Sequence, residues 1–422
     1  MRSANSLLAS LILFFGLQTT GCNSTTSTPT TPGASPAVIP LSNGATLPSV
    51  SGSNVMTLTV NGSTCSANSY PNKPCVSITL CSTAGTNCQT INDILLDTGS
   101  YGLRVFKDVL NAGLYSSLTN VQNGSNPIAE CVQYGDGSKQ WGPVKIGKIT
   151  LGGETPVQTP IQVVDSTFTG MSSKCSGAMT SSTSAGLNGI LGMGLFQFDC
   201  GYNCAISANN GSYYSCDTTA GTCTGSTVSL ANQVQNPVAL LPQDNNGVLI
   251  EFPDVPSGSA TSVEGYLIFG IGTQANNTPT GTTKTYFADS SYGEFTTAYA
   301  GGNYSSFIDS GSNSYAFPYS GTSLTGCSGA YTGWFCPSST TTLSAINNSV
   351  SDSTSGTIQF QIGNFINFYS SPNNVSKQIG AKSGSGIGGL FDWGLPFYIG
   401  RNVYHGIDGK SSSLGSGPYW AY

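Results

Sequence analysis

Short apolar runs separated by turn-forming residues recur along most of the chain. Val, Ile, Thr, Tyr and Phe gather in these runs, and Gly, Asn, Ser and Pro stand between them. Glu, Lys, Arg and Ala, which favour helices, are sparse, and only 8% of the 422 residues are charged. Strands prefer β-branched and aromatic residues, and the separating residues prefer turns. The pattern therefore predicts an all-β protein with many turns.

The N-terminal apolar run differs from the others because it is continuous. It extends from Leu7 to Leu17 after Arg2, which is too short for a membrane span and typical of a signal peptide. The run ends at "LQTTGC" and so resembles a bacterial lipoprotein signal, with Cys22 as the lipidated residue, although Thr19 stands where Leu is usual. Ordinary secretory cleavage is the alternative. We expect residues 1–22 to be the signal peptide and residues 23–52 to be a Ser/Thr/Pro tether.

Two apolar runs end on an Asp followed by a small-residue turn. The turns are Asp97-Thr98-Gly99-Ser100 in "ILLDTGSYGLRVF" and Asp309-Ser310-Gly311-Ser312 in "SSFIDSGSNSYAF". Each is followed by two apolar residues and a Gly, Gly192 in "GILGMG" at 95 residues and Gly400 in "FYIGRNV" at 91 residues. A single Asp-Thr-Gly-Ser is a good ordinary β-turn. Two such turns at nearly equal distances from a partner strand indicate an internal duplication.

The paired turns predict a catalytic dyad of Asp97 and Asp309. Two carboxyl groups about 3 Å apart cannot both ionise freely, so one holds a proton while the other is charged. The charged member can take a proton from water, and the protonated member can polarise a carbonyl group. We expect the hydroxyl groups of Thr98 and Ser310 to hydrogen-bond across the two turns and hold them together.

Other chemistries lack the residues that they need. The net charge is −6 with no basic cluster, which argues against nucleic acid as a partner. His405 is the only histidine, so no multi-histidine metal site can form, and we expect neither metal nor cofactor. We expect His405 itself to lie on a strand.

The cysteines agree with export. Removing Cys22 from the 13 leaves an even number, as expected for disulfides in an oxidising compartment. Five close pairs are expected to close small loops, although the sequence does not settle the connectivity: Cys65 with Cys75, Cys81 with Cys88, Cys200 with Cys204, Cys216 with Cys223, and Cys327 with Cys336.

These segments resemble the pepsin-like aspartic peptidases. "LLDTGSYGLRV" and "FIDSGSNSYAF" are similar to the two active-site loops of that family, and "GILGMG" and "YIGRNV" to its supporting strands. The resemblance implies a bilobal double-ψ β-barrel fold with a central cleft. It places the N-terminal lobe at residues 53–256 and the C-terminal lobe at 257–422. The chain also resembles an uncharacterised family of bacterial lipoproteins that carry both Asp turns and a "GRNVY…GPYWAY" end.

The segment "QYGDGSKQWGPVKIGKITLGG" resembles the flap, the hairpin that closes over substrate in the pepsin-like family. The resemblance makes Tyr134 the flap tyrosine, with Gly135, Asp136 and Ser138 beside it. Arg104 stands where many members have Trp, and it could donate a hydrogen bond to Tyr134 or place a charge near the cleft.

Two further departures concern the second supporting strand and an insertion. Arg401 follows Gly400 where Asp is common in the pepsin-like family. The Cys-rich insertion that begins near residue 198 is favoured as a surface loop pinned by disulfides, with a substrate-facing excursion as the alternative.

The resemblance implies an exported aspartic endopeptidase acting on peptide or protein substrates. We expect a monomer anchored by lipid in the bacterial cell envelope, periplasmic or at the surface, or else secreted. The alternative is a catalytically silent surface lipoprotein of the same fold that binds a peptide, protein or glycan. A glycosidase is the weakest reading, because two carboxylates for sugar hydrolysis do not require duplicated turns.

Overall fold

The structure is a computed structural model that describes residues 38–39, 52–66, 70–255, 258–319, 323–383 and 389–422. The predicted signal peptide and Cys22 lie outside the described residues, as does the predicted tether apart from residues 38–39 and 52. No helix within the described ranges is long and apolar enough to cross a membrane.

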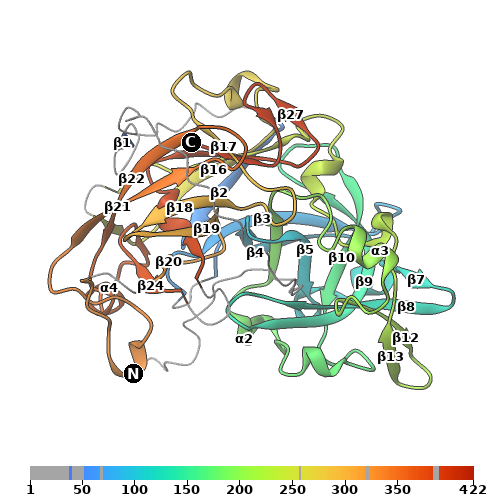
Figure 1. The fold of residues 1–422 in the computed structure, drawn as a ribbon. Coiled ribbons are helices and arrows are strands. Elements are labelled where there is room, and N and C mark those ends of the chain that lie inside the picture. The colour runs from blue at the N-terminus through green and yellow to red at the C-terminus, as the bar shows by residue number, and fades with distance from the viewer. Residues whose placement is uncertain (1–37, 40–51, 67–69, 256–257, 320–322, 384–388) are drawn as a thin grey trace, which may run out of the picture.

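The chain is all-β, which confirms the predicted fold class. Its α-helices are short and lie at the edges of the sheets (Figure 1). They are α1 (Ala112–Ser117), α2 (Ser182–Ala185), α3 (Tyr202–Ile206) and α4 (Phe365–Tyr369). Single 3₁₀ turns include η2 (Ser173–Cys175) and η8 (Leu395–Phe397).

The N-terminal half forms a barrel sheet, drawn from blue to green in Figure 1. Its strands are β3 (Pro74–Cys81), β4 (Cys88–Asp97), β5 (Tyr101–Phe106), β6 (Thr119–Asn120), β7 (Gln122–Asn123), β8 (Asn126–Gln133), β9 (Lys139–Thr150), β10 (Val157–Val164), β11 (Gly189–Met193), β12 (Tyr213–Asp217) and β13 (Thr222–Gly225). β5 and β11 are buried along almost their whole length, so their apolar runs face packed protein on both sides.

A run of antiparallel strands from distant parts of the chain continues this barrel through the pairing of β2 with β3. In spatial order they are β2 (Val55–Val60), β16 (Val263–Phe269), β14 (Gly247–Glu251), β26 (Asn402–Gly406), β29 (Tyr419–Ala421) and β17 (Thr285–Phe287). Because β2 lies in the first half and the others in the second, this layer belongs to both halves.

A separate sheet, formed by strands of the C-terminal half together with β1, occupies the left of Figure 1, mostly in yellow to red. Its strands in order are β1 (Val38–Ile39), β22 (Ser355–Ile362), β21 (Thr341–Asn348), β18 (Phe295–Tyr299), β19 (Gly302–Ile308), β25 (Phe391–Trp393), β20 (Tyr315–Phe317) and β24 (Gly380–Lys382). Two small hairpin sheets pair β15 (Ser259–Ala260) with β23 (Val375–Ser376) and β27 (Ser411–Ser412) with β28 (Gly415–Ser416).

The two sheets contain the same motif, which gives the predicted duplication a structural form. In the first copy β11 lies between β4 and β5, parallel to β4 and antiparallel to β5, while β10 runs parallel to β5 on its other side. In the second copy β25 lies between β19 and β20 with the same directions, while β24 runs parallel to β20. One large apolar cluster contains side chains from both halves, so the motifs share a core.

Six disulfides lie within the described residues, and they include all five expected pairs. The sixth joins Cys131 on β8 to Cys175 in η2 and closes a separation of 44 residues. Disulfides at this density are typical of proteins folded in an oxidising compartment, so they indicate an exported chain.

Candidate active site

The two Asp turns lie at the ends of corresponding strands. Asp97 is the last residue of β4, and Asp309 follows the last residue of β19. Both side chains are fully buried, although they come from different sheets. The structure brings the two carboxyl groups into hydrogen-bonding contact with each other.

Backbone N–H groups and serine hydroxyls hold the carboxyl groups in place. The Gly99 N–H donates to Oδ1 of Asp97 at 2.9 Å and to Oδ1 of Asp309 at 3.1 Å, so one donor bridges the pair. The Gly311 N–H donates to the same oxygen of Asp309 at 2.7 Å. The hydroxyl of Ser100 donates to Oδ2 of Asp97, and that of Ser312 lies 2.9 Å from Oδ2 of Asp309.

The predicted hydrogen bonds across the turns are confirmed. Thr98 Oγ1 donates to the Ile308 carbonyl at 3.0 Å and accepts the Ser310 N–H at 2.9 Å. Ser310 Oγ donates to the Leu96 carbonyl at 2.8 Å and accepts the Thr98 N–H at 3.2 Å. Each hydroxyl therefore hydrogen-bonds to the backbone of the opposite half of the site, donating one hydrogen bond and accepting another.

The two glycines are required by the close approach of the turns. A Cβ atom on Gly99 would lie 2.8 Å from the carboxyl carbon of Asp309. A Cβ atom on Gly311 would lie 2.6 Å from Oδ1 of Asp97. Any side chain at either position would push the opposing carboxyl group away.

Burial raises the pKa of both dyad carboxyl groups, and that of Asp309 is raised well above its usual range. The negative charge of Asp97 adds to the effect on Asp309, whereas hydrogen bonds from Asp309, Ser100 and Gly99 favour the ionised form of Asp97. The shared proton is therefore assigned to Asp309, and the charge to Asp97.

Each turn is supported by the inserted central strand, but the sequence analysis chose the wrong strand for the second turn. In the first copy Gly192 of β11 stands opposite Asp97, as expected. In the second copy Trp393 of β25 stands opposite Ile308, which places Gly394 at the position that corresponds to Gly192. Gly394 follows Asp309 by 85 residues. A Cβ atom there would lie 2.1 Å from a backbone oxygen, so this Gly has the predicted close-packing role.

Gly400 instead lies outside the motif, where its N–H donates to the Phe252 carbonyl just before β26. The comparison of Arg401 with an Asp after the supporting Gly is therefore also wrong. Arg401 is buried, donates to the Phe397 carbonyl at 2.6 Å and lies over the Phe397 ring. The segment "FDWG" escaped recognition because an acid interrupts the apolar pair before its Gly.

That acid, Asp392, is a buried site residue that the sequence analysis missed. Its side chain is fully buried, and its Oδ2 lies within hydrogen-bonding distance of the Ser312 hydroxyl, which also contacts Asp309. Burial raises its pKa well above the usual range, and the charge of Asp97 raises it further.

Tyr398 was also missed, and it connects the dyad support to the only histidine. Its hydroxyl lies 2.9 Å from Thr98 Oγ1 and 3.2 Å from Nε2 of His405. His405 lies on β26, as expected, and burial lowers its pKa to about 3. The ring is therefore neutral across the ordinary pH range.

The predicted flap segment forms a hairpin between β8 and β9, closed by the pair Gln133–Lys139. The Tyr134 N–H donates to the Ser138 carbonyl, and the Ser138 N–H donates to Oδ1 of Asp136 at 2.8 Å. Gly135 lies within this turn, and Gly137 has a φ of +86°, a left-handed conformation that suits Gly.

Tyr134 and Arg104 have other hydrogen-bond partners, so of the two possibilities for Arg104 the structure favours the charge near the site. Tyr134 is buried and donates to Oε1 of Gln140 at 2.8 Å. Arg104 is fully buried beneath the first turn, where it donates to Glu130 at 2.8 Å and to Asp199 at 3.0 Å. Its positive charge favours the ionised form of nearby Asp97.

A cleft of about 670 Å³ opens beside the first turn. Thr98, Gly99 and Tyr101 form one part of its lining, and residues 290–294 form another. Residues 195–203 line it as well, so the start of the Cys-rich insertion faces this cleft while the Cys200–Cys204 disulfide pins it as expected. The exposed rings of Tyr202 and Tyr292 stand among the lining residues.

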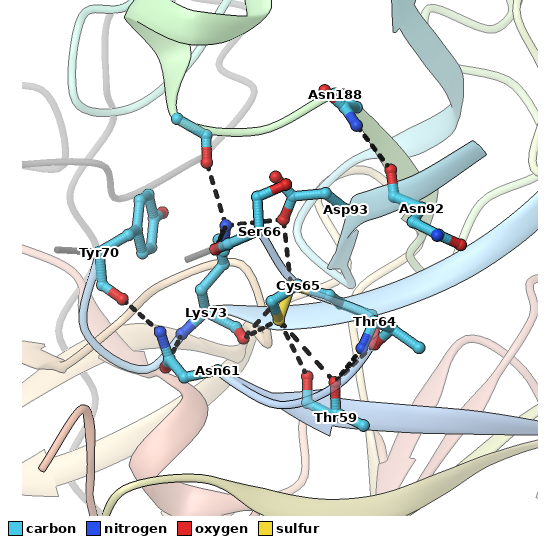
Figure 2. The surroundings of a disulfide bond; sticks show 12 residues. Thr59, Asn61, Thr64, Cys65, Ser66, Tyr70, Lys73, Asn92, Asp93 and Asn188 are labelled. Atoms are coloured by element: carbon cyan, nitrogen blue, oxygen red, sulfur yellow. Dashed lines mark hydrogen bonds and ion pairs between the residues drawn. A yellow bond between two sulfur atoms is a disulfide. The ribbon is translucent and has the colours of Figure 1, made fainter. Parts of the chain in front are cut away.

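The loop that precedes β3 contacts the C-terminal half beside the Asp309 turn. Asn72 is fully buried, and its amide donates to the carbonyls of Asn313 and Ser376 in the second half, at 2.8 Å each. Burial raises the pKa of Tyr70, and the negative charges of Asp136 and of the dyad add to the effect, so this ring lies near both. Figure 2 shows the Tyr70 carbonyl accepting a hydrogen bond from Asn61.

The base of this loop is fixed by a disulfide and a buried ion pair (Figure 2). Lys73 donates to Asp93 at 2.6 Å and to the Gly186 carbonyl at 3.1 Å. Cys65, Cys75 and Asp93 lie close enough together to suggest metal ligands, but both sulfur atoms are committed to their disulfide. This cluster is therefore structural.

Residues 50–422 match the family described as "Protein of unknown function (DUF3443)". The chain belongs to this family. The match covers both Asp turns, the hairpin and the C-terminal strands of this DUF3443 protein. No curated protein matches the sequence. The description of the family names no function, so only the geometry of the site bears on function.

Proposed function

We propose that this DUF3443 protein is an exported, pepsin-like aspartic endopeptidase. The observation that carries the proposal is the arrangement of Asp97 and Asp309, two buried carboxyl groups that share hydrogen bonds with each other and with the Gly99 N–H. The repeated strand motif around them, with its pseudo-twofold character, is the support expected of a bilobal pepsin-like fold.

In the proposed reaction the ionised Asp97 takes a proton from a water molecule as that water attacks a peptide carbonyl carbon. Asp309, which holds the other proton, polarises the carbonyl oxygen and then protonates the leaving nitrogen. General acid–base catalysis of this kind contributes about 10²–10⁴ in rate. The chemistry needs only side chains of this chain, so the proposal includes no metal or cofactor.

The cleft beside Thr98 and Gly99 supports a peptide substrate. Its lining combines aromatic rings with three acids, Asp199, Glu294 and Asp408, and the rings suit an extended segment with apolar side chains. The Asp136 turn of the flap hairpin would close over the chain near Tyr134. We propose a monomer held by lipid at Cys22 in the bacterial envelope, or secreted if the lipid is absent.

One observation favours the second candidate, a silent binding protein of the same fold. Neither Asp97 nor Asp309 has exposed surface, and the cleft lining includes Thr98 and Gly99 but neither carboxyl group. A substrate carbonyl would have to reach the dyad through a movement of the covering segments. Without that movement, the cleft would bind a peptide, protein or glycan without cutting it.

Cleavage of a mixed peptide library between pH 3 and 7 tests the proposal. The purified, oxidised protein is compared with its Asp97→Asn and Asp309→Asn variants, with and without the statine-type inhibitor pepstatin. Asp352→Asn is the control because Asp352 lies on an exposed turn far from the dyad in sequence. Cleavage lost in both dyad variants and kept in the control supports the proposal. Absence of cleavage by the folded parent at every pH supports the binding protein.

A further inference from the structure

The central strands of the two copies of the motif differ in polarity at one buried position. Ile190 of β11 pairs with Leu95, two residues before Asp97. Asp392 of β25 pairs with Phe307, two residues before Asp309. The second copy therefore places an acid where the first has an aliphatic side chain. A buried carboxyl group is costly unless it is hydrogen-bonded or neutral, so this substitution requires a physical explanation.

The hydroxyl of Ser312 links this third acid to the dyad. It lies within hydrogen-bonding distance of Oδ2 of Asp309 and of Oδ2 of Asp392. A serine hydroxyl has one hydrogen, so it can donate to only one of the two carboxyl groups and must accept from the other. One of these two acids is therefore protonated toward Ser312.

The surroundings identify Asp392 as the donor. Oδ1 of Asp309 already accepts the N–H groups of Gly99 and Gly311, and the proton of Asp309 is directed at Asp97. Oδ1 of Asp392 has no hydrogen-bond partner within the described part of the chain. An uncharged carboxylic acid tolerates an unpaired oxygen far better than a carboxylate does.

Within the described part of the chain, the charge that acts on Asp392 is negative and comes from Asp97. The negative charge of Asp97 raises the pKa of Asp392. A negative charge on Asp392 in turn raises the pKa of Asp309 and of Tyr398. Its partner strands are β19 and β20, and on β20 the hydroxyl of Tyr315 hydrogen-bonds to Arg401. Burial and the charge of Asp97 raise the pKa of Asp392, and the hydrogen bond with Ser312 lowers it. The guanidinium of Arg401 is not among the groups that act on this pKa.

On the basis of the proposed peptidase function, we propose that Asp392 is a positioning residue that stores a second carboxyl proton and fixes the protonation state of the dyad through Ser312. When Asp309 gives its proton to the leaving nitrogen, Ser312 passes its hydroxyl proton to Asp309 and takes the carboxyl proton of Asp392. The proton that Asp97 took from water then passes to Asp309 and, through Ser312, restores the proton of Asp392. The site ends with the number of protons with which it began.

The stored proton also extends activity to higher pH. In the proposed sequence of ionisation, Asp392 loses its proton before Asp309, whose hydrogen bond to Asp97 holds its proton in place. The new negative charge raises the pKa of Asp309 and keeps its proton in place. The dyad therefore stays singly protonated over a wider pH range than two carboxyl groups alone would allow.

The pH profile of kcat/KM for Asp392→Asn tests this inference, because the amide can donate to Ser312 but cannot ionise. We expect its alkaline limb to move about one pH unit toward acid, with the acid plateau kept within about threefold. Asp244→Asn is the matched control, since Asp244 is buried and hydrogen-bonded near Thr273 outside the site. An unmoved alkaline limb, or a uniform loss at every pH, would overturn the inference.

A second measurement separates this inference from the proposed function because it needs no cleavage. An acid that stays neutral when folded loses stability relative to the unfolded chain as pH rises above its unfolded pKa. Asp392→Asn should therefore raise the melting temperature by about 2 °C or more at pH 8 and leave it unchanged at pH 3. An inactive parent with this pattern would reject the peptidase but retain the protonated Asp392. An unchanged melting temperature at both pH values would reject the stored proton.

Discussion

Replacing Thr98 by Val removes the hydroxyl that joins the two Asp turns while it keeps the shape of the side chain. Three contacts are lost: the Ser310 N–H, the Ile308 carbonyl and the Tyr398 hydroxyl. The carbonyl keeps a hydrogen bond from Tyr398 at 3.2 Å, so the Ser310 N–H is the group left buried without its partner. One orphaned donor costs about 1–3 kcal/mol and each lost bond about 1 kcal/mol, so we expect a loss of about 3 kcal/mol.

Urea unfolding followed by tryptophan fluorescence measures this loss as a lower midpoint at an unchanged slope. Thr79→Val is the matched control, because Thr79 is a half-buried strand residue whose hydroxyl contacts only Thr90 Oγ1, at 3.0 Å on the sheet surface. Its stability should stay within about 0.5 kcal/mol of the parent. A loss below about 1 kcal/mol for Thr98→Val would refute the view that these hydroxyl bonds hold the two halves together.

Three further outcomes are expected. Gly311→Ala should lower kcat/KM about 100-fold by displacing the opposing carboxyl group, while Gly113→Ala, whose Cβ meets only an atom 3.6 Å away, should leave it unchanged. Replacing Cys131 and Cys175 together by Ser should cost about 4 kcal/mol in chemical unfolding, from the 44-residue separation that the disulfide closes. Burial raises the pKa of Glu251 to about 7, so its ionisation destabilises the fold as pH rises from 5 to 8. Glu251→Gln should therefore raise the free energy of unfolding by about 1 kcal/mol at pH 8 and leave it unchanged at pH 4. Urea unfolding at each pH measures this difference.

Local patterns were enough to locate the two Asp turns, the flap hairpin and five disulfides. Each is a short-range feature: an apolar run that ends on Asp, a turn between alternating strands, or two cysteines within ten residues. Cys131 and Cys175 belonged to no such pattern, because their pairing depends on how η2 folds back against β8. That the first residues of the insertion line the cleft is likewise visible only in the packed structure.

The sequence by itself determined the all-β class and the duplicated Asp turns. These follow from residue preferences and from repetition along the chain, which need no knowledge of distant neighbours. Only the tertiary structure decided which strand supports the second turn, because strand pairing is a long-range choice and "YIG" fits the apolar pattern better than "FDWG" does. It likewise revealed Asp392 beside Ser312. A buried acid has the same letter as an exposed one, and the burial that makes it neutral exists only in the folded chain.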